Sequence, residues 1–308
     1  MIYIIIINWN QYNHTANCIR SLQSISYSEH RIIVVDNASS DGSAEKLEKE
    51  FSSQVDLILH KINTGFTGGS NAGIQYALAQ GAQYIMLLNN DTIVHHNFIE
   101  PLMEQIRLNP AIGVVTPKIY YLNNSKTNRI WAAGGETTLW MGISRSRGRG
   151  QIDNGQFNSV QEVDYASGCC LLTTRDVLEE VGLLTNSYFA YYEDVDWCFR
   201  AKQMGYQIMY VPQSSIWHSV GSSGKTHPSG EGVQSPFVHY LNSRNHIWFL
   251  RTHARGLIFY SAFLYYIINH LFYYSIAFII LNRRRKLKEL WRGFIDGVTK
   301  TPNDEIFV

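Results

Sequence analysis

The run Ile2-Tyr3-Ile4-Ile5-Ile6-Ile7, which ends at Asn8, is apolar and rich in β-branched residues. An unbroken run of this kind is typical of a strand that is buried on both faces, as in the parallel sheets of α/β proteins. It is too short for the apolar core of a signal peptide, and no basic residues precede it. We therefore interpret it as a buried first strand.

Outward from this strand, apolar runs alternate with helical patterns. Strands are expected over residues 31–36, 55–60, 84–88 and within 205–212, and helices over 15–24, 41–51, 71–80 and 176–181. Asp41 is a candidate N-cap, and Gly81 closes the helix before it. The alternation predicts an α/β fold in which a mostly parallel, doubly wound sheet is flanked by helices.

Composition limits the class of protein. A chain of 308 residues suits one large domain, or one domain with an appendage. The net charge of +1 argues against a nucleic-acid binder, which would need a strongly basic surface. The four cysteines show no Cys-x-x-Cys spacing, and Cys169 is adjacent to Cys170. We expect reduced thiols in a cytoplasmic protein.

Polar side chains follow three of the expected strands. Asn8, Asp36 and Asp91 each come directly after an apolar run. In open α/β sheets, ligands bind at the carboxyl ends of the strands. The sequence therefore predicts a ligand site that includes all three residues.

A glycine-rich segment, Asn63-Thr64-Gly65-Phe66-Thr67-Gly68-Gly69-Ser70-Asn71-Ala72-Gly73, follows the third strand and opens a helix. Glycines let backbone amides approach a ligand closely, and a helix N-terminus favours anions such as a diphosphate. The segment lacks the Gly-Lys-Ser/Thr of a P-loop and does not follow the first strand, as a dinucleotide fingerprint would. The alternative is a tight turn that packs the helix on the sheet.

Asn89-Asn90-Asp91 offers a possible metal ligand. A hard divalent cation is usually bound by one or two carboxylates together with substrate phosphates. Asp91 fits that role, and His218, after another expected strand, is a candidate second ligand. Alone, Asp91 would be interpreted as a turn cap. The Gly/Ser segment 221–223 is expected to fold over a bound donor.

Three carboxylates lie within four residues at Glu193-Asp194-Val195-Asp196, directly after the aromatic run 188–192. Neighbouring negative charges and partial burial raise the pKa of a carboxyl group, which suits it to act as a general base. The alternative is an acidic first turn of a helix that the helix dipole stabilises.

Residues 118–160 are polar, and they contain the basic, glycine-rich tract 145–150. A solvated surface loop is expected, or a mobile segment near an anionic acceptor.

From about residue 237 the chain becomes apolar and aromatic, over 257–268 and 271–281, with basic residues on both sides. The stretch is long enough to span a bilayer, but basic residues at both ends give no positive-inside asymmetry. We expect helices that lie on the cytoplasmic leaflet, with the basic cluster 283–288 on anionic lipid. A single membrane span, or a helical hairpin packed on the domain or on a second subunit, remains open.

The motifs resemble those of the inverting family 2 glycosyltransferases of the GT-A fold, and specifically the bacterial rhamnosyltransferase-like branch. The matching segments run in family order and are Asn8-Trp9-Asn10, 35–43, 63–73, 88–91, 167–170, 193–200 and Trp217-His218. Similar proteins carry an aromatic, basic C-terminal region tied to the membrane. The resemblance implies a nucleotide-sugar glycosyltransferase domain over 1–223 and a C-terminal helical, membrane-associating region over 224–308.

The resemblance also implies roles in donor and metal binding. Residues implied to contact the nucleotide sugar are Asp36, which would bond the pyrimidine base, and Asn8, Asn63, Gly65, Asn71 and Asn90. Asp91 fills the last place of the family's Asp-x-Asp motif, and His218 matches a metal-ligand histidine of several relatives. Asn89 stands in the first place of that motif, which removes one charge and suggests weaker metal binding.

For catalysis, the resemblance implies that Asp194 is the base and that Glu193 and Asp196 position it or the acceptor. Trp197, by stacking on a sugar face, and Arg200 are implied acceptor contacts. Mg²⁺ or Mn²⁺ would neutralise the diphosphate leaving group. Asp194 would deprotonate an acceptor hydroxyl, and attack from the opposite face would invert the anomeric carbon in one displacement.

The donor and acceptor are less closely defined. The resemblance favours dTDP-L-rhamnose, with UDP-galactofuranose as an alternative. The implied acceptor is a saccharide or a polyprenyl-diphosphate-linked saccharide in surface polysaccharide synthesis, such as O-antigen or cell wall. A homo-oligomer is compatible with the sequence.

Three other classes of protein fit the sequence less well. A non-catalytic sugar-nucleotide or glycan binder would have little reason to keep both Asp91 and the acidic cluster. A nucleotidyltransferase would need a basic, glycine-rich loop after the first strand, and residues 8–14 contain neither glycine nor Lys or Arg. A processive synthase would need several membrane spans and a Gln-x-x-Arg-Trp signature, which the chain lacks.

Overall fold

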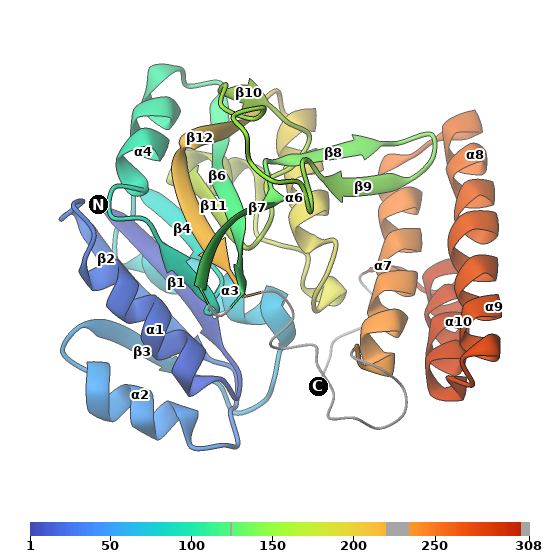
Figure 1. Cartoon of the computed structure of the whole chain (residues 1–308), viewed down its shortest axis with the longest axis horizontal. Coiled ribbons are helices and arrows are strands. Elements are labelled where there is room, and N and C mark those ends of the chain that lie inside the picture. Colours follow the sequence, from blue (N-terminus) through green and yellow to red (C-terminus); the bar gives the residue numbers. More distant parts are fainter. Residues whose placement is uncertain (124, 220–233, 303–308) are drawn as a thin grey trace.

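The computed structural model describes residues 1–123, 125–219 and 234–302. A central sheet forms the core of the chain (Figure 1), in the order β10-β12-β6-β11-β4-β1-β2-β3. Its strands are β1 (Ile2–Asn8), β2 (His30–Asp36), β3 (Val55–Leu59), β4 (Tyr84–Leu88), β6 (Ile112–Asn123), β10 (Gln161–Glu162), β11 (Cys170–Thr174) and β12 (Gln207–His218). The short strand β5 (Thr92–Val94) pairs with β12, and β7 (Ser125–Ala132) pairs with β6.

The prediction of a mostly parallel α/β sheet is confirmed. Strands β1 to β4 are mutually parallel where they pair, and β12 runs parallel to β6. Within the strand order, the antiparallel members are β11, which lies between β4 and β6, and the two-residue β10, which pairs with β12. The first strand is buried on both faces as expected, because Tyr3 and Ile5 enter one core while Ile2, Ile4 and Ile6 enter the other.

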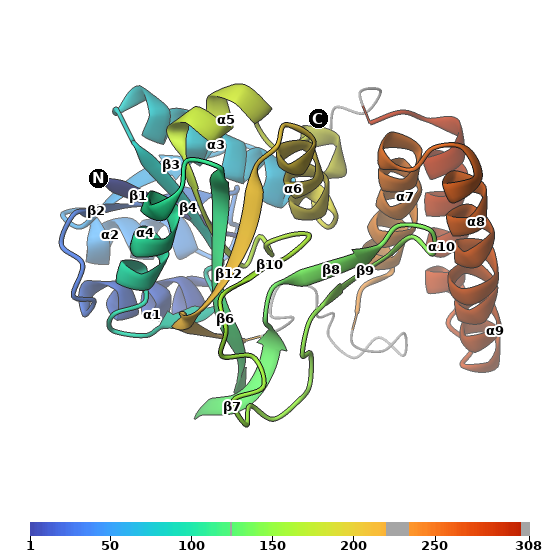
Figure 2. The same ribbon diagram turned by 90° about the horizontal axis from the view of Figure 1, so that it is seen from above.

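Helices cover both faces of the sheet (Figure 2). One core includes residues of α1 (Tyr12–Gln23), α2 (Ser43–Phe51) and α4 (Ile99–Leu108). The opposite core includes residues of α3 (Gly65–Ala79), α5 (Arg175–Val181) and α6 (Glu193–Gln203). The residue before α2 is Gly42, while Asp41 accepts a hydrogen bond from the backbone N–H of Ser43.

The glycine-rich segment belongs to a helix rather than to a loop before one. Helix α3 begins at Gly65, six residues earlier than the sequence suggested. A Cβ atom on Gly73 would lie 2.4 Å from Cγ2 of Ile5, and one on Gly69 would lie 3.2 Å from Cγ2 of Ile7. The absence of side chains here lets α3 lie directly on β1.

Residues 118–160 are not an irregular loop, which corrects that expectation. They extend β6 to Asn123, form β7, and then form a hairpin of β8 (Gly135–Thr138) and β9 (Ile143–Ser146). In β7 the polar residues 125–129 are mostly exposed, whereas Ile130 and Ala132 near its end are buried in the core. The hairpin reaches across to the C-terminal helices (Figure 1), where Ser261 Oγ donates to the backbone oxygen of Trp140.

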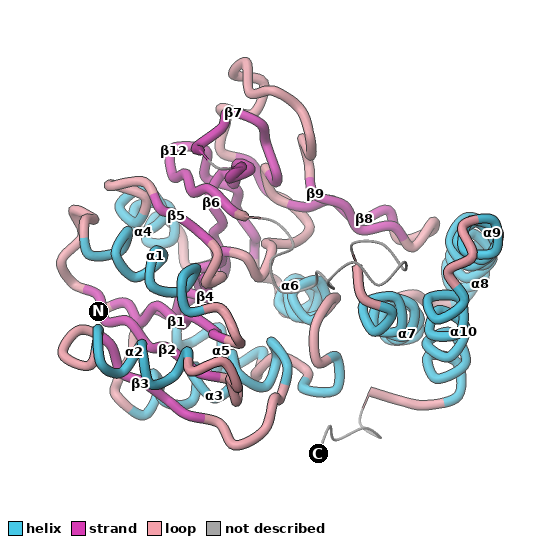
Figure 3. Tube along the Cα trace, turned by 60° about the horizontal axis from the view of Figure 1, so that its bottom comes forward, coloured by secondary structure: helices cyan, strands magenta, loops and turns pink. Residues whose placement is uncertain are grey.

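The C-terminal helices form a layer beside the sheet domain. They are α7 (Pro236–His253), α8 (Gly256–Tyr266), the π-helical turn η2 (Ile267–Phe272), α9 (Tyr273–Ile280) and α10 (Arg284–Thr299). Figure 3 shows α6, α7 and α10 next to one another in that order. Helix α10 lies so close to α7 that a Cβ atom on Gly293 would be 2.3 Å from the backbone oxygen of Tyr240. The expected domain boundary at 223/224 lies outside the described residues, and so does the segment 221–223.

Candidate active site

A buried hydrogen-bond network joins Asn8 and Asp36, two of the three residues expected at the strand ends, with Asn90. Asn8 donates from Nδ2 to Oδ2 of Asp36 at 2.7 Å, and its Oδ1 accepts from the hydroxyl of Thr15 at 2.6 Å. Thr15 also accepts from Nδ2 of Asn90 at 2.9 Å. Ser39 donates to both carboxylate oxygens of Asp36 from its backbone N–H and its hydroxyl, at 2.9 and 2.7 Å. The structure therefore brings Asn8, Asp36 and Asn90 together.

Thr15 was missed as a member of this network. A threonine inside a predicted helix carries no sequence signal for a site, since most such residues are structural. It enters the network because α1 follows β1 after a short turn, which brings its first turn alongside the end of β4.

Asn63 and Gly65 lie beside the same edge, in a turn that Asn37 holds. Asn37 donates from Nδ2 to Oδ1 of Asn63 at 3.0 Å and to the backbone oxygen of Gly65 at 2.8 Å. Its Oδ1 accepts from the backbone N–H of Thr64 at 3.1 Å, while Asn63 accepts from the N–H of Gly65 at 2.8 Å. The sequence placed Asn37 within a motif without assigning it a role, and the structure shows that it holds this turn in place.

Asn71 is directed elsewhere. Its side chain donates to the backbone oxygen of Leu184 at 2.8 Å and to Oδ1 of Asn186 at 2.7 Å, and it accepts from the N–H of Leu184 at 3.1 Å. The amide is therefore engaged on both sides with the 184–186 segment. It fixes that segment on α3 rather than joining the network around Asp36.

Asp91 and His218 meet where β5 pairs with the end of β12. Nε2 of His218 lies 3.0 Å from Oδ1 of Asp91, and both side chains are buried. The contact arises because β5, directly after Asp91, pairs with the end of β12, where His218 is the last residue. The ring of Trp131 packs edge-on against the His218 imidazole, with 4.8 Å between centroids.

This pair fits a divalent cation that takes its other ligands from a substrate. A carboxylate and an imidazole are both ligands of Mg²⁺ or Mn²⁺ sites, and such ions commonly complete their shell with phosphate oxygens and water. Nδ1 of His218 is buried and has no hydrogen-bond partner among the described residues. Over the same residues, no group of three or more His, Cys, Asp or Glu side chains could hold a metal by itself.

The loop of residues 187–192, which leads into α6, has an unusual backbone. Phe189, Tyr191 and Tyr192 have φ values of 64°, 72° and 73°. Bulky residues rarely adopt positive φ, and each such residue costs roughly 1–3 kcal/mol unless surrounding structure enforces it. Gly65 lies against this loop, because a Cβ atom there would be 2.3 Å from the backbone oxygen of Phe189. Gly65 thus makes room for the loop beside the first turn of α3.

Asp194 lies at the start of α6, held by two backbone donors. Its Oδ2 accepts from the N–H of Gly168 and its Oδ1 from the N–H of Val195, both at 2.8 Å. Burial raises the pKa of the Asp194 carboxyl above its usual value, although these hydrogen bonds oppose the shift. The residue therefore has the environment that its expected role as a base requires.

Glu193 is the more deeply buried neighbour. Burial, and then the charge of Asp194, raise the pKa of Glu193 well above its ordinary value. Its Oε2 is buried without a hydrogen-bond partner among the described residues. A neutral carboxyl group in that position can donate a hydrogen bond, which an ionised one cannot.

Cys169 lies between the two acidic sites. Its backbone oxygen accepts from the N–H of Asn89 at 2.9 Å, next to the expected metal motif, and its neighbour Gly168 contacts Asp194. Burial, and then the charges of Asp91 and other neighbours including Asp194, raise the pKa of the Cys169 thiol well above its usual value. Adjacent residues before β11 therefore hold Asp194, through Gly168, and the Asn89–Asp91 segment, through Cys169.

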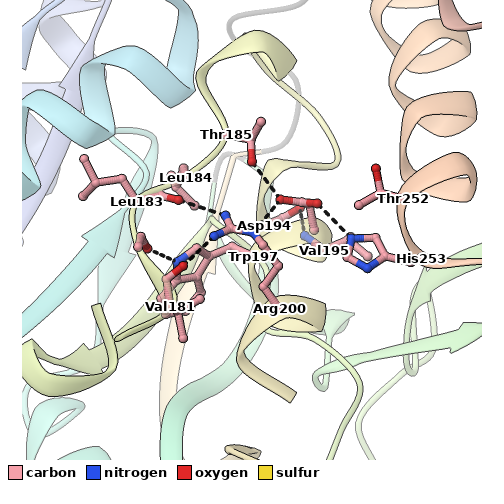
Figure 4. Close-up of polar contacts among 12 residues, drawn as sticks. Val181, Leu183, Leu184, Thr185, Asp194, Val195, Trp197, Arg200, Thr252 and His253 are labelled. Atoms are coloured by element: carbon pink, nitrogen blue, oxygen red, sulfur yellow. Dashed lines mark hydrogen bonds and ion pairs between the residues drawn. The ribbon is translucent and has the colours of Figure 1, made fainter. Parts of the chain in front are cut away.

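Asp196 does not belong to that region, which corrects its expected role beside Asp194. Its Oδ2 accepts from Thr185 at 3.0 Å and from Nε of Arg200 at 3.1 Å, and its Oδ1 lies 2.8 Å from Nε2 of His253. Figure 4 shows His253 reaching from α7 into this cluster. Burial opposes ionisation, but the hydrogen bond with His253 and the charge of Arg200 together lower the pKa of Asp196. Asp196 joins α6 to α7.

Trp197 and Arg200 are hydrogen-bonded to the 181–183 segment (Figure 4). Trp197 is 1% exposed and donates from Nε1 to the backbone oxygen of Gly182 at 2.8 Å, so the expectation that it stacks on a sugar is wrong. Arg200 donates from both terminal nitrogens to the backbone oxygens of Val181 and Leu183, each at 2.8 Å. The expected acceptor role of Arg200 is corrected as well, because its guanidinium fixes this segment to α6.

Comparison with known proteins agrees with this geometry. The family model described as "Glycosyl transferase family 2" matches residues 3–182. The low-salt glycan biosynthesis hexosyltransferase Agl10 of Haloferax volcanii is 28% identical over 206 residues, which is 67% of this chain and 62% of that protein. The dTDP-rhamnosyl transferase RfbF of Shigella flexneri is 24% identical over 258 residues, which is 81% of this chain and 80% of that protein.

Among solved structures, GalNAc-T7 with UDP, GalNAc and Mn²⁺ is similar, with a TM-score of 0.63 and 16% identity over 99% of this chain and 57% of that chain. At this identity the likeness concerns the fold alone. The expected GT-A fold is confirmed, with a helical C-terminal region beside it.

Proposed function

The chain belongs to glycosyltransferase family 2, and from that premise we propose that it transfers a hexose from a nucleoside-diphosphate sugar to a glycan acceptor with inversion of configuration. One observation carries the proposal. Asp194, with its raised pKa, and the segment that ends at Asp91 are held by the adjacent residues Gly168 and Cys169, and Asp91 contacts His218. A base for the acceptor and a cation site for the leaving group are the two groups that such a transfer needs.

The donor would bind along the buried network at the strand ends. Asp36 and Asn8, backed by Ser39 and Thr15, would offer hydrogen bonds to the pyrimidine base. The turn around Asn63 and the first turn of α3 would lie near the phosphates, since a helix N-terminus favours anions.

Asp194 would remove the proton of an acceptor hydroxyl. The oxygen then forms a bond to the anomeric carbon, while the bond from that carbon to the diphosphate oxygen breaks and its electron pair leaves with the nucleoside diphosphate. The hydrogen bonds from Gly168 and Val195 fix the direction of the carboxylate before the reaction, so little reorganisation is needed. Glu193, whose pKa is raised by burial, would lie beside the acceptor or donor sugar and bond it through Oε2.

Asp91 and His218 would hold Mg²⁺ or Mn²⁺. When bound, the ion supplies positive charge that stabilises the departing diphosphate. The protein's part is to place one carboxylate and one imidazole in contact, with their remaining surfaces buried against Trp131 and neighbouring residues. The presence of Asn89 rather than a second carboxylate supports weak binding of the free ion, with the substrate phosphates completing the site.

For the donor we propose dTDP-L-rhamnose, with UDP-galactofuranose as the alternative. The support is the similarity to the Shigella rhamnosyl transferase over 81% of the chain, together with the sequence motifs. The acceptor we propose is a saccharide or a polyprenyl-diphosphate-linked saccharide of a surface polysaccharide, which suits an enzyme that acts at the cytoplasmic face of a membrane.

Membrane association is supported by the C-terminal helices. Residues Gly256–Ile280 form, among the described residues, one helix long and apolar enough to cross a bilayer, with a mean hydropathy of 1.5 and only 22% of its most apolar window buried. Large apolar side chains are exposed along it, among them Leu257, Leu264 and Ile280. Arg284, Arg285 and Lys288 follow it and are exposed, which suits contact with anionic lipid. Lys286, which the sequence placed in the same basic cluster, is buried instead.

We propose that this helix lies in the membrane surface rather than spanning it. The amphipathic helix α10 packs along it and carries charged residues, including Arg292 and Asp296. A span would draw α10 and its charges into the hydrocarbon, at a cost of several kcal/mol. In-plane binding leaves α10 on the aqueous side.

The test is a transfer assay of the full chain with dTDP-L-rhamnose, UDP-galactofuranose and other nucleotide hexoses, with and without Mg²⁺ or Mn²⁺ and a membrane extract. Metal-dependent turnover of one donor would support the proposal and name the sugar. Tight nucleotide binding without transfer in any mixture, extract included, would indicate a sugar-nucleotide binding protein instead.

A further inference from the structure

Helix α7 contacts the loop that carries the catalytic carboxylate. The 187–192 loop lies between the first turn of α3 and α7, and its continuation is Glu193 and Asp194. On the α3 side, the backbone oxygen of Phe189 accepts from the N–H of Thr67 at 3.1 Å. On the other side, two adjacent residues of α7, Arg244 and Asn245, supply the contacts.

Arg244 and Asn245 donate to four of the six backbone carbonyls of the loop. Nη2 of Arg244 donates to the backbone oxygens of Ser187 and Tyr188 at 2.8 and 3.1 Å. Nδ2 of Asn245 lies 3.0 Å from the oxygen of Tyr188 and 2.8 Å from the oxygens of Ala190 and Tyr191. Both side chains are fully buried.

The orientation of the two side chains is itself fixed. Nε of Arg244 donates to Oδ1 of Asn245 at 2.9 Å, which turns the amide nitrogen of Asn245 toward the loop. The guanidinium lies over the rings of Trp248, at 4.2 Å, and Tyr240, at 5.2 Å. Helix α10 supports α7 from behind, since a Cβ atom on Gly297 would be 3.0 Å from the backbone oxygen of Arg244.

We propose that Arg244 and Asn245 are positioning residues, which hold the strained loop so that Asp194 points at the acceptor hydroxyl. The positive φ values of three loop residues persist only if surrounding contacts hold the backbone in that conformation. On the α7 side, the hydrogen bonds to the loop carbonyls are those contacts. Tyr192 is the residue before α6, and its backbone oxygen accepts from the N–H of Asp196. A shift of the loop therefore moves the first turn of α6 and the Asp194 carboxylate with it. The assignment rests on the proposed function, because it is transfer that a displaced base would slow.

The experiment compares Asn245→Ala with Asn242→Ala in the full chain. Asn242 is on the same helix, and its amide donates to the backbone oxygen of Val238 without touching the loop, so it is a matched control. We expect Asn245→Ala to lower kcat by about 10²-fold, the effect of misplacing a reacting group by about 1 Å. Binding of UDP and dTDP, measured by calorimetry, should stay within about threefold of wild type, since the loss falls on the transition state.

Hydrogen exchange provides a readout that needs no turnover. Backbone amides of residues 187–196 should exchange faster in Asn245→Ala, and those in Asn242→Ala should match wild type. If Asn245→Ala fails to fold, Arg244→Lys replaces it, because lysine keeps the charge but loses the two-carbonyl geometry. That variant should show the same faster exchange and a loss of kcat of about tenfold.

Three results would overturn the proposal. One is a folded Asn245→Ala with wild-type kcat, whatever its melting temperature, because the contacts would then serve stability alone. A second is an equal loss of nucleotide affinity and kcat, which would assign the loop to donor binding. A third is unchanged exchange in the loop. A wild-type protein that transfers no sugar would count against the proposed function, while faster loop exchange in the variant would still support the contacts as the loop's restraint.

Discussion

The backbone N–H of Gly168 donates a hydrogen bond of 2.8 Å to Oδ2 of Asp194, across 26 positions of sequence. Gly168 comes just before β11, whereas Asp194 is in the first turn of α6. The bond therefore ties the carboxylate to the edge of the sheet, where the Asn8–Asp36 network and the Asp91–His218 pair lie. Through this hydrogen bond, the acidic N-terminus of α6 becomes part of the candidate active site.

Replacing Asp194 by asparagine should abolish transfer, because the amide cannot accept the acceptor's proton. We expect kcat to fall by about 10³-fold or more, within the range for loss of a general base. Nucleotide binding should be retained, since Asp194 is not part of the Asn8–Asp36 network. Asp176→Asn, an exposed carboxylate in α5, is the control. Normal turnover in Asp194→Asn would rule out the base assignment.

The pH dependence of transfer should reflect the environment of Asp194. Burial raises the pKa of its carboxyl, and the base must be ionised to work. Rates should therefore rise with pH through that raised pKa, with an acidic limb above the ordinary Asp value of about 3.9. A kcat profile between pH 4 and 8 measures this, and a flat profile down to pH 4 would contradict it.

Replacing Asp91 by alanine should weaken metal-dependent donor binding. The change removes the carboxylate of the only expected acidic ligand, so the donor's affinity with Mn²⁺ should fall by about tenfold or more, while its affinity without metal changes little. His218→Ala should act in the same direction. His95→Ala, close to β12 but exposed, serves as the control. Titration calorimetry with UDP and dTDP gives the measurement, and unchanged metal dependence would argue against the site.

Replacing Asp196 by asparagine should destabilise the fold. Asp196 is buried with Arg200 and His253, and breaking such a cluster costs about 3 kcal/mol. Because its pKa is lowered in the folded state, its ionised form contributes stability above the unfolded pKa of about 3.9, and this is lost as the pH falls through the folded value. Urea unfolding should show the full difference from wild type at pH 7, and the difference should shrink as the pH falls from about 3.9 toward about 2. An equal difference at both ends of that range would contradict the role of ionisation.

Replacing both Leu257 and Leu264 by serine should weaken membrane binding. Each exposed leucine would lose roughly 1.5–3 kcal/mol of burial if fully inserted, so binding to vesicles containing phosphatidylglycerol should fall by about 10²-fold. Raised salt should weaken the wild-type interaction, because Arg284, Arg285 and Lys288 are exposed. Ile62→Ser changes an exposed apolar residue elsewhere and should bind normally. Equal binding by the double variant would exclude this face.

The sequence predicted most strands of the sheet, but it did not predict how the segments around the sheet pack against it. The strand 84–88 was predicted with the observed bounds, because it is a short apolar run between residues that are typical of turns. The segment 118–160 was expected to be a loop, because residues 125–129 are polar without a break, and the strand there is defined by its pairing with β6. The C-terminal helices were expected as an appendage, yet α7 reaches into the acidic cluster through His253.

Sequence alone determined the α/β class, the candidate ligands at the strand ends and the acidic turn, because apolar period and residue chemistry are local properties of the chain. Tertiary structure alone decided which of three neighbouring carboxylates faces which partner. On one turn of α6, Asp194 accepts a hydrogen bond from Gly168, Oε2 of Glu193 is buried without a hydrogen-bond partner among the described residues, and Asp196 contacts His253. Residues one and two apart on a helix point in different directions, so their roles depend on what the fold packs against each side.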